Sequence, residues 1–339
     1  MNAAVSRWLV PVGAVGLVLS CAGWWMNARS FYAGWLAAFV LLSSWPLGSI
    51  ALLLTHALTG GRWGETLRPA LRTGVGALPL VPLAFLALLP GFSTLFPWPD
   101  EHFANHFWLD TRFFAIRCAI YVVLWLLFAW LTLRRADVFA FAAPGLIVLA
   151  FTVTFASIDS TMSLDPHFVS SIYGILSAAG MTLLALSLAV LFTAVGASAD
   201  VRNDLGKLLL ALVVLWVYLD FMQLLIIWQS DLASEVPWYL ERSSGFWGAV
   251  RAIVAFGHFV LPFFLLLSPR ARRSRRLLLC VASLLVVMEA IRVWWTILPS
   301  LGLTVGWIDI ACVAGLGCVA ARFAVWVDGW PVLVEARDV

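Results

Sequence analysis

The stretch Ser157-Ile-Asp-Ser-Thr-Met-Ser-Leu-Asp-Pro-His-Phe-Val-Ser-Ser171 is a short polar interruption between two long apolar runs. It contains two carboxylates, Asp159 and Asp165, and one imidazole, His167. A segment this polar cannot face lipid hydrocarbon, so it has to lie at a membrane face or be buried in protein. We expect the chain to hold this loop, together with a second polar segment at 229–245, at one surface of a helical membrane body.

The overall composition indicates a membrane protein. The chain has 339 residues, of which 63% are hydrophobic and 12% are charged, whereas soluble domains carry about 25% charged residues. So few charges cannot cover a water-exposed surface, so lipid has to solvate much of the chain. The formal net charge of +3 is too small to indicate nucleic-acid binding. We therefore predict an all-α polytopic membrane protein that forms a single integral membrane domain over residues 1–339.

Ten stretches are long and apolar enough to cross a bilayer, which takes about 20 residues of helix. The third of them contains three prolines, and neighbouring helices can repair such interruptions inside a membrane. The predicted spans are Trp8–Met26, Phe31–His56, Ala70–Pro90, Arg112–Leu133, Val138–Ala156, His167–Val195, Lys207–Trp228, Trp247–Leu267, Arg276–Ile297 and Val305–Trp326.

The distribution of cations orients these spans, because cytoplasmic loops carry an excess of Lys and Arg. The loops after the even-numbered spans are rich in cations, which predicts that both termini are cytoplasmic. The loops at 91–111, 157–166 and 229–246 then face outward, and they are acidic. The loops after odd-numbered spans contain only Arg29, Arg112 and Arg242 as cations. The cations after even-numbered spans are Arg62, Arg68, Arg72, Arg134, Arg135, Arg202, Lys207, Arg270, Arg272, Arg273, Arg275 and Arg276.

A weak internal repeat suggests how the spans are grouped. Phe31-Tyr-Ala-Gly34 opens the second span and Ile172-Tyr-Gly174 opens the sixth, and both spans are expected to enter from the outside. This permits two four-helix bundles in the same orientation, formed by helices two to five and six to nine. The corresponding segments are 31–156 and 167–297, with peripheral helices at 8–26 and 305–326.

Ionisable side chains inside the spans are candidates for function, because each is costly unless it is paired or hydrated. Asp220 lies near the middle of the seventh span and His258 lies deep in the eighth. Glu289 and Arg292 stand at i, i+3 on one face of the ninth. A proton path needs such groups bridged by water, and the polar loop would open it at the outer face. The predicted proton-handling residues are Asp159, Asp165, His167, Asp220, His258, Glu289 and Arg292.

Each of these groups also has a structural interpretation. Glu289 and Arg292 would then form a buried ion pair that fixes the ninth helix. Asp220 would pair with Arg251 or Arg292 for the same reason. Asp309, near the outer end of the tenth span, is expected to be hydrated.

The sequence gives little support for a metal or a covalently bound cofactor. None of the five cysteines forms a C-x-x-C pair, which argues against c-type haem attachment and Cys-ligated iron–sulfur clusters. The two histidines within spans, His56 and His258, are expected at different depths, which argues against a haem with two axial imidazoles. His102 and His106 have a spacing that binds metal on a helix, but nearby prolines favour a solvated loop. Nucleotide-binding and hydrolase motifs are absent from the sequence.

Three motifs occur in order along these spans. Leu58-Thr-Gly-Gly-Arg-Trp-Gly64 follows the second span, MSLDPHF at 162–168 follows the fifth, and Val236-Pro-Trp-Tyr-Leu-Glu-Arg242 lies between the seventh and eighth. In this order they resemble the motifs of NrfD/polysulfide-reductase-like membrane subunits of alternative complex III, in particular its second quinone-binding-type (ActF-like) subunit. The resemblance covers about residues 30–300.

The resemblance implies two four-helix bundles plus two peripheral helices. It also implies a quinol-oxidising respiratory complex in the bacterial inner membrane, with an iron–sulfur protein, c-type cytochromes and a paralogous NrfD-like subunit as partners beside membrane lipid. Such a subunit would hold no redox centre, and the ligand it would bind is quinone or quinol, at residues that the sequence does not specify. Its role would be quinol-side proton handling, a proton path or scaffolding.

Two other functions fit the same residues. A secondary transporter would use the intramembrane charges to bind a solute near the midplane. A purely structural or assembly subunit would use them only to hold its helices together. The apparent repeat is parallel, whereas transporters often carry inverted repeats, so the respiratory hypothesis is favoured.

Overall fold

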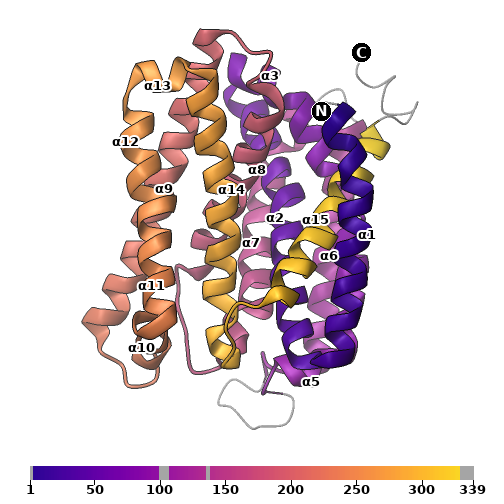
Figure 1. Cartoon of the computed structure of the whole chain (residues 1–339), viewed down its shortest axis with the longest axis vertical. Helices are drawn as coiled ribbons and strands as arrows, with labels where there is room; N and C mark the ends of the chain where they lie inside the picture. Colours follow the sequence, from indigo (N-terminus) through magenta and orange to yellow (C-terminus); the bar gives the residue numbers. More distant parts are fainter. Residues whose placement is uncertain (1–2, 99–106, 135–137, 329–339) are drawn as a thin grey trace.

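The computed structural model describes residues 3–98, 107–134 and 138–328, which form a bundle of long helices (Figure 1). Within these residues ten helices are long and apolar enough to cross a membrane, as predicted. The chain is therefore an all-α polytopic membrane protein. The elements in chain order are α1 (Ala3–Met26), α2 (Ala28–Thr59), α3 (Arg62–Val75), α4 (Leu80–Leu86), η1 (Leu89–Gly91), α5 (Phe92–Leu95), α6 (Thr111–Arg134), α7 (Phe139–Ser160), η2 (Met162–Leu164), α8 (Tyr173–Thr193), α9 (Ala199–Ser230), α10 (Val236–Ser243), α11 (Gly245–Val254), η3 (Ala255–Val260), α12 (Leu261–Leu267), α13 (Pro269–Arg273), α14 (Arg275–Ile297), η4 (Pro299–Leu301) and α15 (Trp307–Asp328).

Several spans differ from the prediction in their bounds or regularity. The seventh, α9, begins at Ala199 and not at Lys207. The third runs from Arg62 to Leu86 as α3 and α4, joined by a turn that ends at Pro79. The sixth begins at Tyr173 and not at His167, because the chain after Pro166 stays non-helical as far as α8. The eighth contains the π-helical segment η3 between α11 and α12, and π-helical turns occur frequently at functional sites.

The helices α2 and α8 form the centre of the bundle. Of the ten spans, α2 has the largest buried share, 83% of its most apolar window against 22% for α1. It contacts α3, α7, α8 and α15, while α8 also contacts α7, α9 and α14. The contact between α2 and α8 joins the two predicted four-helix segments, and the division into two bundles stays a prediction.

Gly48 lets α2 and α8 approach closely, which gives a first testable prediction. A Cβ atom at Gly48 would lie 2.3 Å from the carbonyl oxygen of Met181. We expect Gly48→Ala to force the helices apart and to destabilise the protein by about 1–3 kcal/mol, measured as a lower melting temperature in detergent. The control is Gly317→Ala on α15, where no described atom lies within 4 Å of the added Cβ. Equal melting temperatures for the two variants would contradict this account of the contact.

The first and last spans pack against each other at the side of the bundle. The helix α1 contacts α15, and α15 in turn contacts α2. A Cβ atom at Gly16 would lie 2.6 Å from the Cα of Gly315, so the two backbones nearly touch. Small residues allow such close packing between membrane helices.

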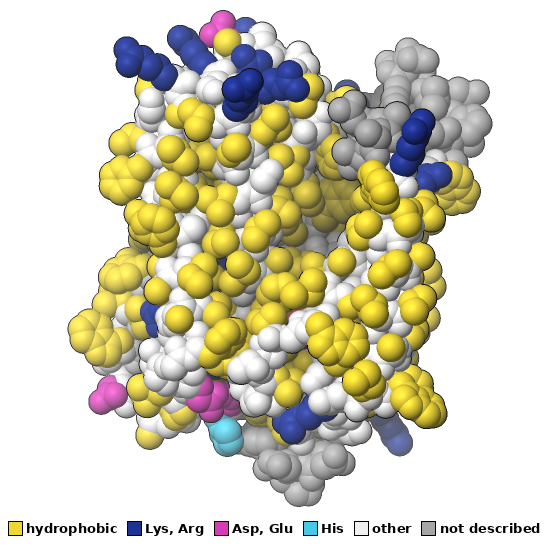
Figure 2. Space-filling view, viewed as in Figure 1, with side chains coloured by type: hydrophobic (Ala, Val, Ile, Leu, Met, Phe, Trp, Pro, Cys, Tyr) yellow, Lys and Arg dark blue, Asp and Glu magenta, His cyan; other side chains and the backbone are white. Residues whose placement is uncertain are grey.

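Charged side chains are unevenly distributed between the two ends of the bundle, the α13 end and the α10 end. Lys and Arg gather at the α13 end, where α1 begins and α15 ends (Figures 1 and 2). Two of these cations satisfy carbonyl groups at helix C-termini: Arg72 donates to Leu133 O at 2.7 Å, and Arg272 donates to Leu266 O at 2.6 Å. The assignment of the α13 end to the cytoplasm stays a prediction.

Candidate functional site

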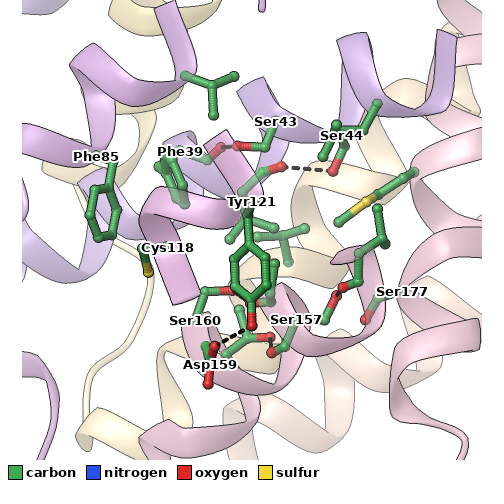
Figure 3. Close-up of a pocket in the computed structure, with 18 of the residues that line it drawn as sticks. Phe39, Ser43, Ser44, Phe85, Cys118, Tyr121, Ser157, Asp159, Ser160 and Ser177 are labelled. Atoms are coloured by element: carbon green, nitrogen blue, oxygen red, sulfur yellow. Dashed lines mark hydrogen bonds between the residues drawn. The ribbon is translucent and has the colours of Figure 1, made fainter. Parts of the chain in front are cut away.

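A mainly apolar cavity lies inside the bundle between α2, α4, α6, α7, α8 and α14 (Figure 3). It leaves about 80 Å³ for the centres of water molecules, which is room for several waters. Aromatic side chains such as Phe39, Phe85 and Trp125 form much of its wall. Hydroxyl groups line the remainder, and they belong to Ser43, Ser44, Tyr121, Ser157, Ser160, Thr161, Tyr173, Ser177 and Thr296.

Most of these hydroxyl groups already donate their proton within the protein. The hydroxyl of Ser43 donates to Phe39 O at 2.8 Å, and that of Ser157 donates to Val153 O at 2.7 Å. Ser44, Ser160, Thr161 and Thr296 likewise donate to the carbonyl four residues earlier. Serine and threonine in helices commonly make this bond. A hydroxyl bonded in this way offers only its lone pairs to a ligand, so the cavity is rich in hydrogen-bond acceptors.

A buried ion pair between Arg117 and Asp159 lies at the edge of this cavity. Arg117 donates to both carboxylate oxygens, from Nε at 3.0 Å and from Nη2 at 2.8 Å. Tyr121 donates to Oδ2 at 2.9 Å (Figure 3), and Trp108 donates to Oδ1 at 3.0 Å. Each oxygen thus accepts two hydrogen bonds, which fills the capacity of a carboxylate.

The location of Asp159 differs from the prediction. It was expected in an outward-facing loop at 157–166, but α7 continues to Ser160 and the Asp159 side chain is only 3% exposed. Burial is possible because Arg117 compensates the charge. The rings of Trp108 and Phe113 cover the guanidinium group, with centroids 4.1 and 4.4 Å from its carbon.

The remaining predicted loop residues lie at the α10 end of the bundle. The backbone N–H of His167 donates to Asp165 Oδ1 at 3.1 Å, and the His167 ring is exposed. The next residue, Phe168, stacks on Trp238 with ring centroids 4.3 Å apart. The motif at 162–168 and the motif at 236–242 are therefore in contact at the α10 end of the bundle, and the assignment of this end to one membrane face stays a prediction.

Arg242 fastens this surface to the end of α14. Its side chain is completely buried. It donates to Trp238 O at 2.8 Å, to Thr296 O at 2.9 Å and to Ser300 Oγ at 2.5 Å, and also to Trp295 O at 3.3 Å. Burial lowers the pKa of Arg242 to about 10, so the group stays charged at neutral pH. It thus satisfies carbonyl groups of the last turn of α14.

A second buried cluster joins His258, Glu289 and Arg292. Arg292 donates to both oxygens of Glu289, at 2.9 and 2.5 Å, and His258 Nε2 lies 3.4 Å from Glu289 Oε2. The predicted ion pair of the ninth span is thus present, and His258 joins it. Gly180 on α8 leaves the room, since a Cβ there would lie 2.8 Å from Glu289 Oε1. Arg292 also lines the cavity, so the cavity reaches this cluster.

The imidazole of His258 is held by packing rather than by hydrogen bonds. It lies in the π-helical segment η3, is completely buried, and meets the indole of Trp216 edge to face at 4.1 Å. Neither ring nitrogen has a hydrogen-bond partner among the described residues, nor does Trp216 Nε1. Buried polar atoms of this kind are commonly satisfied by water, which would connect His258 to Glu289.

Two expectations about aspartates differ from the structure. Asp220 forms no ion pair with Arg251 or Arg292 among the described residues. Asp309 is buried, with 3% exposure, and does not lie at a water-exposed surface as expected. It accepts a hydrogen bond from Gly306 N at 2.7 Å and lies against Gly34 of α2, because α15 packs on α2 at this point.

Sequence reasoning did not select several residues that form the site. Neither Arg117 nor Tyr121 is among the predicted proton-handling residues. They stand four residues apart on one face of α6, which is the signal that could have linked them. The described residues contain no group of three or more His, Cys, Asp or Glu that could hold a metal ion. His102 and His106 lie outside the described residues.

Comparisons with known proteins leave the family open. No protein-family model matches the chain, and no curated protein matches it at a significant level. The class of protein rests on its own geometry: a multi-pass α-helical membrane protein with an internal cavity that carries hydroxyl groups and two buried ion pairs.

Proposed function

We propose that the protein is a membrane subunit of a quinol-oxidising respiratory complex of the alternative complex III type, and that its cavity receives the quinol head group. The observation that carries this proposal is the excess of acceptors in a largely apolar cavity. A quinol presents two O–H donors on a flat apolar ring, whereas a quinone presents only acceptors. The hydroxyl groups around the cavity, which already donate within the protein, therefore suit the reduced form.

Tyr121 is the group best placed to accept a hydrogen bond from a quinol hydroxyl. Its own O–H is committed to Asp159, so the phenol oxygen offers lone pairs to the cavity that it lines. Because Asp159 is saturated by four donors, it fits the role of a positioning group rather than that of the final proton acceptor. This refines the proton-handling role predicted for Asp159.

Oxidation of one quinol yields one quinone, two protons and two electrons. In this proposal the electrons pass to a redox centre of a partner subunit, either an iron–sulfur cluster or a c-type haem. The protons leave through groups that border the cavity. The cluster of Arg292, Glu289 and His258 is contiguous with the cavity and supports a route deeper into the bundle. Asp165 and His167, at the α10 end, support a route to the outer face of a bacterial inner membrane.

The decisive experiment is a pull-down of the tagged protein in mild detergent, followed by haem staining and mass spectrometry. Co-purification of c-type cytochromes, an iron–sulfur protein and a paralogous membrane subunit is the expected result. A lone, colourless protein that is folded and monodisperse would overturn the proposal. Uptake of a solute by liposomes that contain this lone protein would then favour the secondary-transporter alternative.

Tyr121→Phe tests the assignment of the cavity. We expect quinol turnover per complex to fall at least about tenfold, because the variant lacks the phenol oxygen that accepts a hydrogen bond from quinol. The variant also loses the hydrogen bond from Tyr121 to the Asp159 carboxylate, and a hydrogen bond to a charged group is worth about 1.5–3 kcal/mol. Turnover is measured with a short-chain quinol and normalised to haem content. The control is Tyr218→Phe, the same change at an exposed tyrosine of α9 that does not line the cavity. Reduced complex abundance with unchanged turnover would assign Tyr121 a structural role.

A further inference from the structure

A second pocket with basic residues lies at the α13 end of the bundle, away from the cavity. Its walls come from the ends of α2, α3 and α6 and from the start of α7. It leaves about 290 Å³ for the centres of water-sized molecules. We call it the α2–α7 pocket, and its described lining residues are Leu53, His56, Ala57, Gly60, Arg68, Arg72, Thr132, Val138 and Phe139.

The charged side chains among the described lining residues of the α2–α7 pocket are all cationic. Arg68 and Arg72 line it together with the imidazole of His56, and no Asp or Glu is among its described lining residues. Arg72 is held in place by its bonds to Thr132 O and Leu133 O. Arg68 is exposed and makes no hydrogen bond or ion pair with any described residue. The pocket therefore has one anchored cation, and a second cation without an anionic partner in the described structure.

Four of the other lining residues are apolar and lie near helix ends. Leu53 and Ala57 belong to the last turns of α2, and Val138 and Phe139 lie at the start of α7. The Phe139 ring is 63% exposed, so this wall is open to the surroundings of the bundle. The pocket thus combines an anion-attracting end with an apolar side at the end of four membrane helices.

We propose that the α2–α7 pocket binds the phosphate of an anionic phospholipid headgroup, with the acyl chains lying against Leu53 and Phe139. Basic pockets between membrane helices on the cytoplasmic side bind such headgroups, and the α13 end is the one that the distribution of cations predicts to be cytoplasmic. A free phosphate ion would neutralise the charge of Arg68 but would leave the apolar wall uncovered. This inference is independent of quinol binding.

The test is native mass spectrometry of the purified protein, titrated with phosphatidylglycerol or phosphatidylcholine. We expect retained phosphatidylglycerol adducts and a weaker response to phosphatidylcholine. In Arg68→Ala the affinity for phosphatidylglycerol should fall about fivefold, as expected for one cation near an anionic lipid. Arg68→Lys keeps the charge and should stay within about twofold of the unchanged protein, since Lys binds phosphate as a point charge.

The matched control is Arg270→Ala, which removes one exposed cation from α13 at the same end of the bundle but outside the pocket. It should change the affinity less than about twofold. Equal weakening by Arg68→Ala and Arg270→Ala would show a non-specific charge effect and overturn the site. Displacement of the lipid by millimolar inorganic phosphate would show that the pocket prefers a free anion, and would overturn the lipid assignment. Equal retention of both lipids would do the same.

Discussion

Arg242→Met is expected to lower the free energy of unfolding by about 4 kcal/mol or more. The substitution removes donors from Trp238 O, Thr296 O and Ser300 Oγ in a site without exposure. Each buried acceptor that loses its partner costs about 1–3 kcal/mol. The loss would release α10 from the end of α14, and with it the contact between Phe168 and Trp238. Thermal unfolding in detergent should show a decrease of roughly 10 °C.

The control for this prediction is Arg251→Met on the neighbouring helix α11. Arg251 makes no hydrogen bond or ion pair with described residues, and its main contact is with the ring of Tyr239, whose centroid lies 5.3 Å away. This cation–π contact is worth about 0.5–2 kcal/mol, so the control should lose much less stability. If both variants melt at similar temperatures, Arg242 does not fasten α10 to α14.

Asp159→Asn is the second substitution with a large expected effect, about 3–5 kcal/mol of lost stability. The substitution leaves the Arg117 guanidinium buried without a counter-charge, and this is the costly way to break a buried ion pair. The amide would also turn an N–H₂ group towards the donors of Trp108 or Tyr121. Chemical or thermal unfolding of the purified protein measures the loss.

The double variant Arg117→Met/Asp159→Asn separates the charge effect from the general effect of mutation. It removes both charges, so its loss of stability should be about 2 kcal/mol smaller than the summed losses of Arg117→Met and Asp159→Asn, in the range found for contacting residues. Simple additivity of the two losses would mean that the pair is not coupled. Because Tyr121 is unchanged, the double variant also tests whether the positioning of its hydroxyl depends on the carboxylate.

The membrane fold was accessible from the sequence because lipid imposes a length and a polarity on every span. Ten apolar stretches correspond to ten helices. The ends of the spans were harder to predict from the sequence where local hydrogen bonding or amphipathic character competes with hydropathy. The sixth span is predicted to begin at His167, but residues 167–172 are non-helical, and the backbone N–H of His167 donates to the Asp165 carboxylate. The first turns of α3, from Arg62, are amphipathic and have a low mean hydropathy, so hydropathy alone placed the start of this span at Ala70.

The residues of the candidate functional site could be predicted only in part from the sequence. Glu289 and Arg292 are three residues apart, so helical spacing alone placed them together. The pair Arg117–Asp159 joins residues 42 positions apart on two helices, and no local pattern encodes such a contact. The π-helical turn that carries His258 has no proline or glycine pattern specific to it. Whether Asp309 is buried or hydrated depends on how α15 packs against α2, which the sequence of α15 alone does not determine.

The contact between α1 and α15 has a consequence for biosynthesis. The ribosome delivers α1 to the membrane before any other described span and α15 after all of them, yet the backbones of Gly16 and Gly315 nearly touch. During synthesis, the face of α1 that contains Gly16 is therefore exposed to lipid until α15 is inserted. Newly made chains that lack α15 would present that face to membrane quality control, which would distinguish unfinished molecules from finished ones.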